Sequence, residues 1–194
     1  MDDVSTSDQQ LIDQCLSGQS DAFGKLVTRY EKRLYGTLVH MVGSVHEARD
    51  VSQEAFVLAF RKLKSFRQES SFYSWLFRIA YNAAISRHRR RRGATASVDA
   101  IRETTGTEPT DDRPESDPAY HLQASERQAL VQNALNELAE EFRTVIVLRE
   151  MEGLSYEQIA EMVDVPVGTV RSRIHRARSE LREKLTRALA NERS

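Results

Sequence analysis

The sequence predicts an all-α protein made of two small helical domains. Apolar residues recur at the three-and-four spacing of amphipathic helices, and hydrophobic residues make up 40% of the 194 residues, enough for a core in each domain. This pattern disappears near residue 93, where Ser, Thr, Gly and Pro begin to alternate with acidic residues, a composition typical of a flexible linker. We therefore expect a first domain over residues 1–92, a flexible acidic linker over 93–122 and a second domain over 123–194.

The first domain is expected to contain four helices, over residues 7–18, 23–43, 45–63 and 72–92, with a polar break at 66–71. Ser44 followed by Glu47 has the spacing of a capping box, in which each side chain answers a backbone donor of the first helical turn. The apolar stripes of these helices are expected to form one helical bundle.

The fourth of these helices carries more aromatic residues than one core contact needs. Trp75 lies on one line of the helix, and Tyr73 and Phe77 lie on another. Rings beside arginines suit single-stranded nucleic acid, because unpaired bases stack on rings while guanidinium groups neutralise phosphates. Two alternatives stay open: Trp75 and Phe72 belong to the core, and the run Arg89–Arg92 is a solvated basic tail.

The second domain is expected to form a floor of two helices, over 130–138 and 142–151, followed by a helix-turn-helix. Ser155 and Gln158 have the spacing of a capping box that starts a short helix. Asp164 then interrupts the pattern, in a turn that needs a left-handed backbone, which Asp tolerates better than most residues.

The second helix of this motif is the one that predicts DNA binding. Ala160 is small enough to let the two helices cross closely, while Val170 and Ile174 close the angle between them. The arginine, serine and histidine side chains of this helix can bind phosphates and base edges in the major groove. Arginines alone would favour a solvated basic helix, but arginines on this motif favour a DNA-binding helix.

Cysteine and histidine usage excludes several kinds of site. Cys15 is the only cysteine, which excludes an internal disulfide and a cysteine zinc site, and its spacing from Leu11 favours a small core residue. His46-Glu47 begins like a zinc-protease helix, but Asp50 stands where the second histidine would be. Nor is a nucleophile beside a base visible. We therefore expect no enzyme activity, no metal and no cofactor.

Charge is strongly segregated along the chain although the net charge is only −1. The first 24 residues are acidic and contain no Lys or Arg, so they lack the basic start of a signal peptide. No apolar run is long enough for a membrane span. We expect a cytoplasmic protein that does not insert into a membrane.

Five motifs occur along the chain in a recognisable order. They are the stretches Asp50–Phe56, Ser65–Arg67, Phe72–Ala80, Leu148–Ala160 and Val165–Arg178. Together they resemble bacterial extracytoplasmic-function (group IV) RNA polymerase sigma factors of the sigma-E (RpoE-like) type. The resemblance implies that the first domain is sigma region 2 and the second is sigma region 4. These regions would carry RNA polymerase core to a promoter, in a stress or envelope response, while the polymerase makes the phosphodiester bonds.

The resemblance also implies roles for three sets of residues. Docking on the β′ clamp helices of the polymerase would use Asp50, Gln53, Glu54 and Phe56. Holding the unpaired −10 element, with one base flipped out, would use Phe66, Ser70, Ser71, Phe72, Tyr73, Trp75 and Arg78. Reading of the −35 element in the major groove would use Arg171, Ser172, Arg173, His175 and Arg176.

Further partners follow from the same resemblance. The floor helices of region 4 would touch the β flap, and an anti-sigma factor, often membrane-bound, would hold the two domains inactive. One alternative stays open, a stand-alone helix-turn-helix regulator of transcription. Such a regulator would need a dimer interface or an effector domain, and residues 20–92 instead offer a basic aromatic helix.

Overall fold

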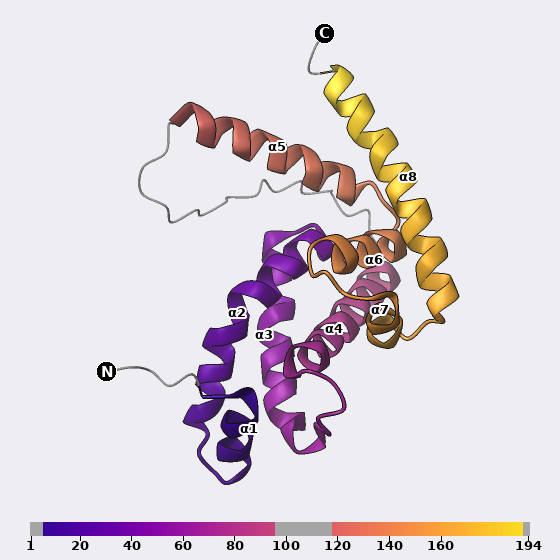
Figure 1. Cartoon of the computed structure of the whole chain (residues 1–194). Coiled ribbons are helices and arrows are strands. Elements are labelled where there is room, and N and C mark those ends of the chain that lie inside the picture. Colours follow the sequence, from indigo (N-terminus) through magenta and orange to yellow (C-terminus); the bar gives the residue numbers. More distant parts are fainter. Residues whose placement is uncertain (1–5, 96–117, 192–194) are drawn as a thin grey trace. The chain divides into compact units, whose positions relative to one another are not determined.

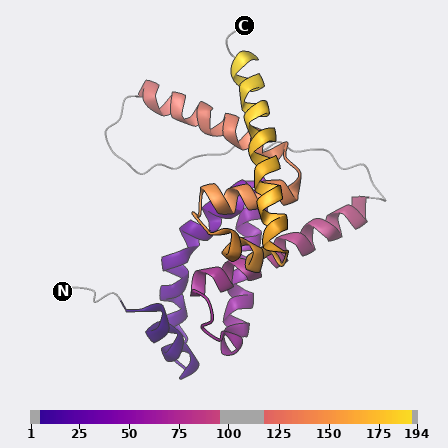
Figure 2. The ribbon, with the colours of Figure 1, turned by 45° about the vertical axis from the view of Figure 1, so that its right-hand side comes forward.

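The computed structural model describes the backbone of residues 6–95 and 118–191 and the side chains of residues 6–90 and 126–190. Within those ranges the regular elements are all helical, which confirms the all-α prediction (Figures 1 and 2). The described residues divide into two compact units, residues 6–38 with 48–95 and residues 39–47 with 118–191. Most of the expected linker at 93–122 lies outside the described residues.

The first unit is built from α1 to α4, drawn from indigo to magenta in Figure 1, except for the end of α2 and the start of α3 at residues 39–47. These elements are α1 (Asp8–Leu16), α2 (Asp21–Val42), α3 (Val45–Lys62), the short 3₁₀ turn η1 (Leu63–Ser65) and α4 (Phe72–Thr95). Each α-helix contributes fully buried side chains to the core, among them Leu11, Leu34, Val51 and Phe77. Burying one such side chain stabilises a fold by roughly 1.5–3 kcal/mol. Cys15 lies half-buried on α1, and this burial raises the pKa of its thiol.

The second unit is built on α8, which contacts all three other helices of the unit. Its elements are α5 (Pro118–Asn136), α6 (Glu140–Glu150), α7 (Tyr156–Val163) and α8 (Val167–Asn191). The first of them begins at Pro118, inside the expected linker, where proline suits a first helical turn that has no use for its missing N–H.

The helix-turn-helix forms as its sequence predicts. Ser155 Oγ accepts a hydrogen bond from Gln158 N at 3.2 Å, and Gln158 Oε1 accepts one from Ser155 N at 2.9 Å. Asp164 ends α7 in the left-handed conformation, with φ 55° and ψ 53°. Ala160 and Ile174 are buried where α7 and α8 pack together. The capping box and the aspartate turn therefore fix the angle at which α8 leaves the motif.

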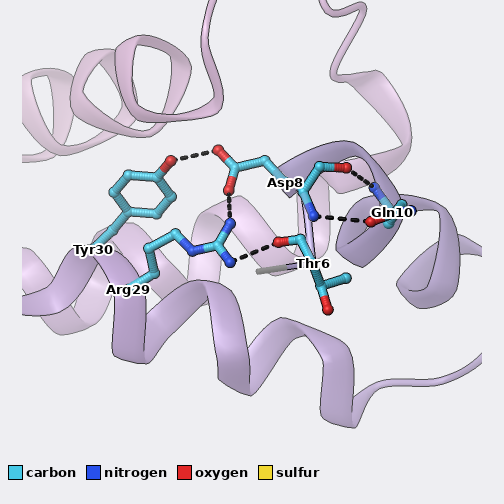
Figure 3. Close-up of polar contacts among 6 residues, drawn as sticks. Thr6, Asp8, Gln10, Arg29 and Tyr30 are labelled. Carbon is cyan, nitrogen blue, oxygen red and sulfur yellow. Dashed lines mark hydrogen bonds and ion pairs between the residues drawn. The ribbon is translucent and has the colours of Figure 1, made fainter. Parts of the chain in front are cut away.

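The start of α1 is tied to α2 by a polar cluster, which we call the N-terminal anchor (Thr6, Asp8, Arg29 and Tyr30; Figure 3). The Asp8 carboxylate accepts hydrogen bonds from Arg29 Nη1 and from the Tyr30 hydroxyl, one on each oxygen. Arg29 Nη2 also donates to the carbonyl oxygen of Thr6 at 2.7 Å. The anchor therefore joins two helices whose polar partners lie more than 20 residues apart in sequence.

Replacing the capping residue of α7 should weaken the second unit. Ser155→Ala removes the acceptor for the Gln158 N–H, so we expect the free energy of unfolding to fall by about 1 kcal/mol. Urea unfolding followed by circular dichroism measures the change. Ser179→Ala is the matched control, because Ser179 is exposed within α8 and should change the unfolding free energy by at most about 0.5 kcal/mol. Equal effects of the two substitutions would contradict a capping role.

Candidate nucleic-acid and protein-docking surfaces

The first turns of α8 expose a polar face opposite a buried one. Val170, Ile174 and Ala177 are at most 1% exposed. On the other side, the exposed side chains form what we call the recognition face, made of Arg171, Ser172, His175 and Arg176. Residues spaced by one, four and five positions lie together on one side of a helix, so these four can contact one ligand at the same time.

Arg173, the fifth residue predicted for this face, lies to one side of it. The Arg173 side chain is 24% exposed and its guanidinium is 3.9 Å from the Glu141 carboxylate of α6. The reason is its position, because residue 173 lies about 100° around the helix from 172 and toward the α6 side. The structure therefore gives Arg173 an intramolecular partner that the sequence pattern did not indicate.

Two further arginines brace the helix-turn-helix. Arg149 Nη1 donates to the Leu154 carbonyl at 2.7 Å, and its guanidinium lies 5.2 Å from the centre of the Tyr156 ring. Arg178 donates twice to Glu150, at 3.0 and 2.6 Å, and this hydrogen bonding raises the pKa of Arg178. Arg149 therefore joins the end of α6 to the start of α7, and Arg178 joins α8 to the end of α6. Sequence reasoning did not predict either contact.

The aromatic residues around the start of α4 divide between core and surface. Phe72 and Tyr73 are only 3% and 4% exposed, so the structure places in the core two rings that the sequence assigned to the unpaired strand. Both point inward because the first turn of α4 packs on Tyr30 of α2. For Phe72, the structure favours the core alternative.

Phe66 and Trp75 remain partly exposed and form what we call the ring pair. Their ring centres are 5.1 Å apart and the ring planes are inclined by 46°. Phe66 comes from the loop between η1 and α4, and Trp75 comes from the first turn of α4, so the pair bridges loop and helix. A tilted, half-exposed pair of rings offers flat apolar surface to a further ring.

Several polar residues lie close in sequence to the two residues of the ring pair. Arg67 and Arg78 are exposed, and Ser70 is half-buried. Ser71 is exposed and accepts a hydrogen bond from the Ser74 N–H at 3.1 Å, which caps α4. Gln68 has a left-handed backbone, with φ 60°, an unusual conformation for a residue other than glycine. The site therefore combines rings, cations and hydroxyl groups at one end of α4.

One side of α3 presents both carboxylates and apolar groups. Asp50 and Gln53 are exposed and Glu54 is half-exposed, whereas Phe56 is 8% exposed and belongs to the core. Phe56 turns inward because it lies about 120° around the helix from the middle of the polar side. The large exposed apolar residues of this side are Val57 (51%) and Phe60 (47%). We call the docking face the set Asp50, Gln53, Glu54, Val57 and Phe60.

Arg87 of α4 contacts the two carboxylates of the docking face. Its guanidinium lies 2.7 Å from Asp50 Oδ2 and 3.3 Å from Glu54 Oε2, and all three side chains are at least 33% exposed. Exposed ion pairs of this kind are worth about 0–1 kcal/mol. Because these ion pairs are weak, the carboxylates of Asp50 and Glu54 are able to leave Arg87 and pair with a cationic side chain of another protein.

The described residues contain no group of three or more His, Cys, Asp or Glu side chains arranged to hold a metal ion. No helix in the described part of the chain combines the length and the apolar character that a membrane crossing requires.

Two family models match the chain, over separate ranges of residues. Residues 26–94 match sigma-70 region 2, and residues 128–181 match sigma-70 region 4. The first match contains the docking face and the ring pair, and the second contains the recognition face.

Relatives extend this similarity over nearly the whole chain. The chain is 42% identical to the ECF RNA polymerase sigma-E factor of Haemophilus influenzae over 185 residues, which cover 92% of this chain and 95% of the relative. It is 40% identical to the RNA polymerase sigma-H factor of Pseudomonas aeruginosa over 178 residues, which cover 90% of this chain and 91% of the relative.

Solved structures are similar as well. The sigma factor RpoE in complex with the anti-sigma factor NepR from Bartonella quintana is 26% identical, with a TM-score of 0.70, and the match covers 84% of this chain and 96% of that one. CnrH, in complex with the cytosolic domain of CnrY, is 28% identical, with a TM-score of 0.62, and the match covers 96% and 99%.

Because these relatives match both units in one chain, a stand-alone helix-turn-helix regulator is not favoured. At 40–42% identity over nine tenths of its length, the chain belongs to the extracytoplasmic-function RNA polymerase sigma factors, which direct promoter-specific initiation of transcription.

Proposed function

We propose that this sigma factor uses its three surfaces on three different targets. The docking face binds the β′ clamp helices of RNA polymerase core, the ring pair binds the unpaired −10 strand, and the recognition face reads the −35 element. The chain works in the cytoplasm, and the polymerase carries out the catalysis. The observation that carries this proposal is the two-sided character of α8. Four polar side chains are exposed on one side of this helix, and the side chains on the opposite side are at most 1% exposed.

The recognition face has the chemistry of a major-groove reader. Arg176 and Arg171 can donate to guanine O6 and N7 or to phosphates, and Ser172 and His175 can donate or accept. The Ser172 hydroxyl donates to the Thr169 carbonyl at 2.9 Å, which leaves its oxygen lone pairs for a base donor. Arg173, turned toward Glu141, contributes to phosphate contacts more than to base contacts.

The ring pair has the chemistry of a single-strand binder. A base stacked on Phe66 or Trp75 gains about 1–3 kcal/mol, and this offsets the cost of unstacking it from the duplex. Arg67 and Arg78 are exposed beside the rings and can neutralise the adjacent phosphates. Ser70 and Ser71 offer hydroxyl groups to the edge of a flipped base. Phe72 and Tyr73 are buried, and Phe72 packs against both rings of the ring pair.

Two surfaces suit the polymerase core. The docking face offers carboxylates around an apolar centre made of Val57 and Phe60, the arrangement of a protein interface with a desolvated middle and a polar rim. In the second unit, a groove of about 430 Å³ between α6 and α8 is lined by Ile146, Leu181 and Leu189 among others. This groove suits an apolar segment of a partner, and we assign it to the β flap.

An anti-sigma factor is the further partner that we infer. The similar RpoE of Bartonella quintana was crystallised with the anti-sigma factor NepR, and the solved structure of CnrH is a complex with the cytosolic domain of CnrY. This chain has exposed apolar side chains that a partner could cover, since Val57, Phe60 and Leu189 are about half exposed. A membrane-bound anti-sigma factor would therefore occupy surfaces that the polymerase also needs.

Run-off transcription tests the proposed function as a whole. Polymerase core lacking any sigma factor is combined with the purified chain and a genomic promoter library, and the start sites are mapped. We expect defined start sites preceded by common −10 and −35 elements, because core alone does not select promoters. A chain that binds duplex promoter DNA equally well with and without core, and gives no defined starts, would contradict the proposal.

Arg176 should contribute sequence selectivity. We expect Arg176→Ala to weaken promoter binding by the holoenzyme by about 1–3 kcal/mol and to relax the preference at one −35 base pair. Arg173→Ala is the matched control, because its guanidinium already faces Glu141, and it should weaken binding less and leave the preference unchanged. Binding to promoters with each −35 position varied measures both. An equal loss on every sequence would make Arg176 a phosphate contact.

Phe60 should contribute to core binding. Truncation of an apolar side chain at the centre of an interface costs about 1–2 kcal/mol, so Phe60→Ala should weaken core binding by that amount. Leu16→Ala is the matched control, because Leu16 is 45% exposed in the same unit but lies on α1, outside the α3 residues that define the docking face. Titration of labelled chain with core measures the affinity. If both variants bind core equally well, the docking face does not include Phe60.

A further inference from the structure

We propose that the N-terminal anchor positions the ring pair, so that Asp8 and Tyr30 control the capture of the unpaired −10 strand without touching it. This inference rests on the proposed function of the ring pair. It assigns a role to a polar cluster of α1 and α2 that neither core docking nor −35 recognition uses.

A continuous series of ring contacts connects the anchor to the ring pair. The Tyr30 ring lies 5.6 Å from the Phe72 ring and 5.7 Å from the Tyr73 ring, centre to centre. Phe72 in turn lies 5.9 Å from Phe66 and 5.9 Å from Trp75. Two contacts therefore separate the anchor from both members of the ring pair.

Tyr30 is fixed at both of its ends. Its hydroxyl donates to Asp8, whose other oxygen accepts from Arg29 (Figure 3), and its ring stacks on Tyr73 at an interplanar angle of 29°. Burial, followed by the hydrogen bond to Asp8, raises the pKa of Tyr30 to about 12. The phenol therefore stays protonated and remains a donor at neutral pH.

Tyr73 is fixed as well. The Arg33 guanidinium lies 4.0 Å from the centre of the Tyr73 ring, and the Tyr73 hydroxyl lies 3.3 Å from the Thr37 hydroxyl, with both residues buried at that contact. Tyr30 therefore packs between Asp8 and Tyr73, and its ring also contacts Phe72.

The ring pair needs such support because half of it comes from a loop. Phe66 follows η1, and the loop after it contains Gln68 in a left-handed conformation rather than a regular hydrogen-bonded element. The position of the Phe66 ring is then set by the rings on which it packs, Phe72 and Trp75. A binding site must hold its groups within about 0.5 Å of the productive geometry, so a shift of Phe72 is enough to weaken stacking.

The test uses holoenzyme assembled from core and the full chain. The probe is a single-stranded non-template −10 oligonucleotide with 2-aminopurine at the base expected to flip, because its fluorescence reports stacking. Tyr30→Leu removes the ring, and we expect an affinity for the probe about tenfold lower, which corresponds to about 1.4 kcal/mol. Tyr30→Phe keeps the ring and removes only the bond to Asp8, so its affinity should be about threefold lower, a partial rescue.

Three controls make the result specific. Ile12→Val alters a buried residue of α1 outside the ring series and should leave probe affinity unchanged. Affinity for core should be the same in all of these variants, since the docking face is unchanged. Trp75→Ala alters the ring pair itself and should lower probe affinity at least as much as Tyr30→Leu.

The outcomes separate the inference from the proposed function. If Trp75→Ala weakens probe binding but Tyr30→Leu does not, the anchor is not a positioning device, although the ring pair still binds DNA. If Ile12→Val and Tyr30→Leu weaken binding equally, the effect is general loss of stability and the inference is wrong. If Trp75→Ala has no effect, the ring pair does not bind the −10 strand, and the proposed function fails together with the inference.

Discussion

A helix that buries one side in the core exposes the opposite side to solvent, and this geometric constraint underlies the recognition face on α8 and the docking face on α3. On α8, burial of Ile174 and its neighbours aims Arg171 and Arg176 outward. On α3, burial of Val51 and Phe56 aims Asp50 and Phe60 outward. The core of each unit therefore determines which side chains are exposed, and a change in core packing rotates a whole set of exposed side chains at once.

The start of α4 shows how one aromatic cluster can serve both stability and binding. Rings such as Phe72 and Tyr73 are buried and hold α4 on α2, whereas Phe66 and Trp75 stay partly exposed in contact with them. A binding surface built directly on the core inherits its rigidity, because packed side chains have few alternative positions. Such a surface leaves the rings of Phe66 and Trp75 partly exposed to water when no partner covers them.

Much of the local structure could be predicted from short-range sequence patterns. Capping by Ser155, the left-handed turn at Asp164 and the polar side of α8 depend on residues within a few positions of one another, so their physical causes are visible in the sequence. Whether Arg173, Phe56 and Tyr73 face the core or the surface could not be predicted in the same way. Each lies near the edge of a helical stripe, where a small rotation of the helix decides between core and surface.

By itself the sequence determined the helical class, the helix-turn-helix and the sigma-factor family, because these follow from periodicity, capping and motif order. Only the tertiary structure decided which rings are buried, and that Arg87 pairs with Asp50 while Tyr30 pairs with Asp8. Those contacts join residues more than 20 positions apart. They form only when whole helices pack, and packing depends on the summed shape of many side chains rather than on any local pattern.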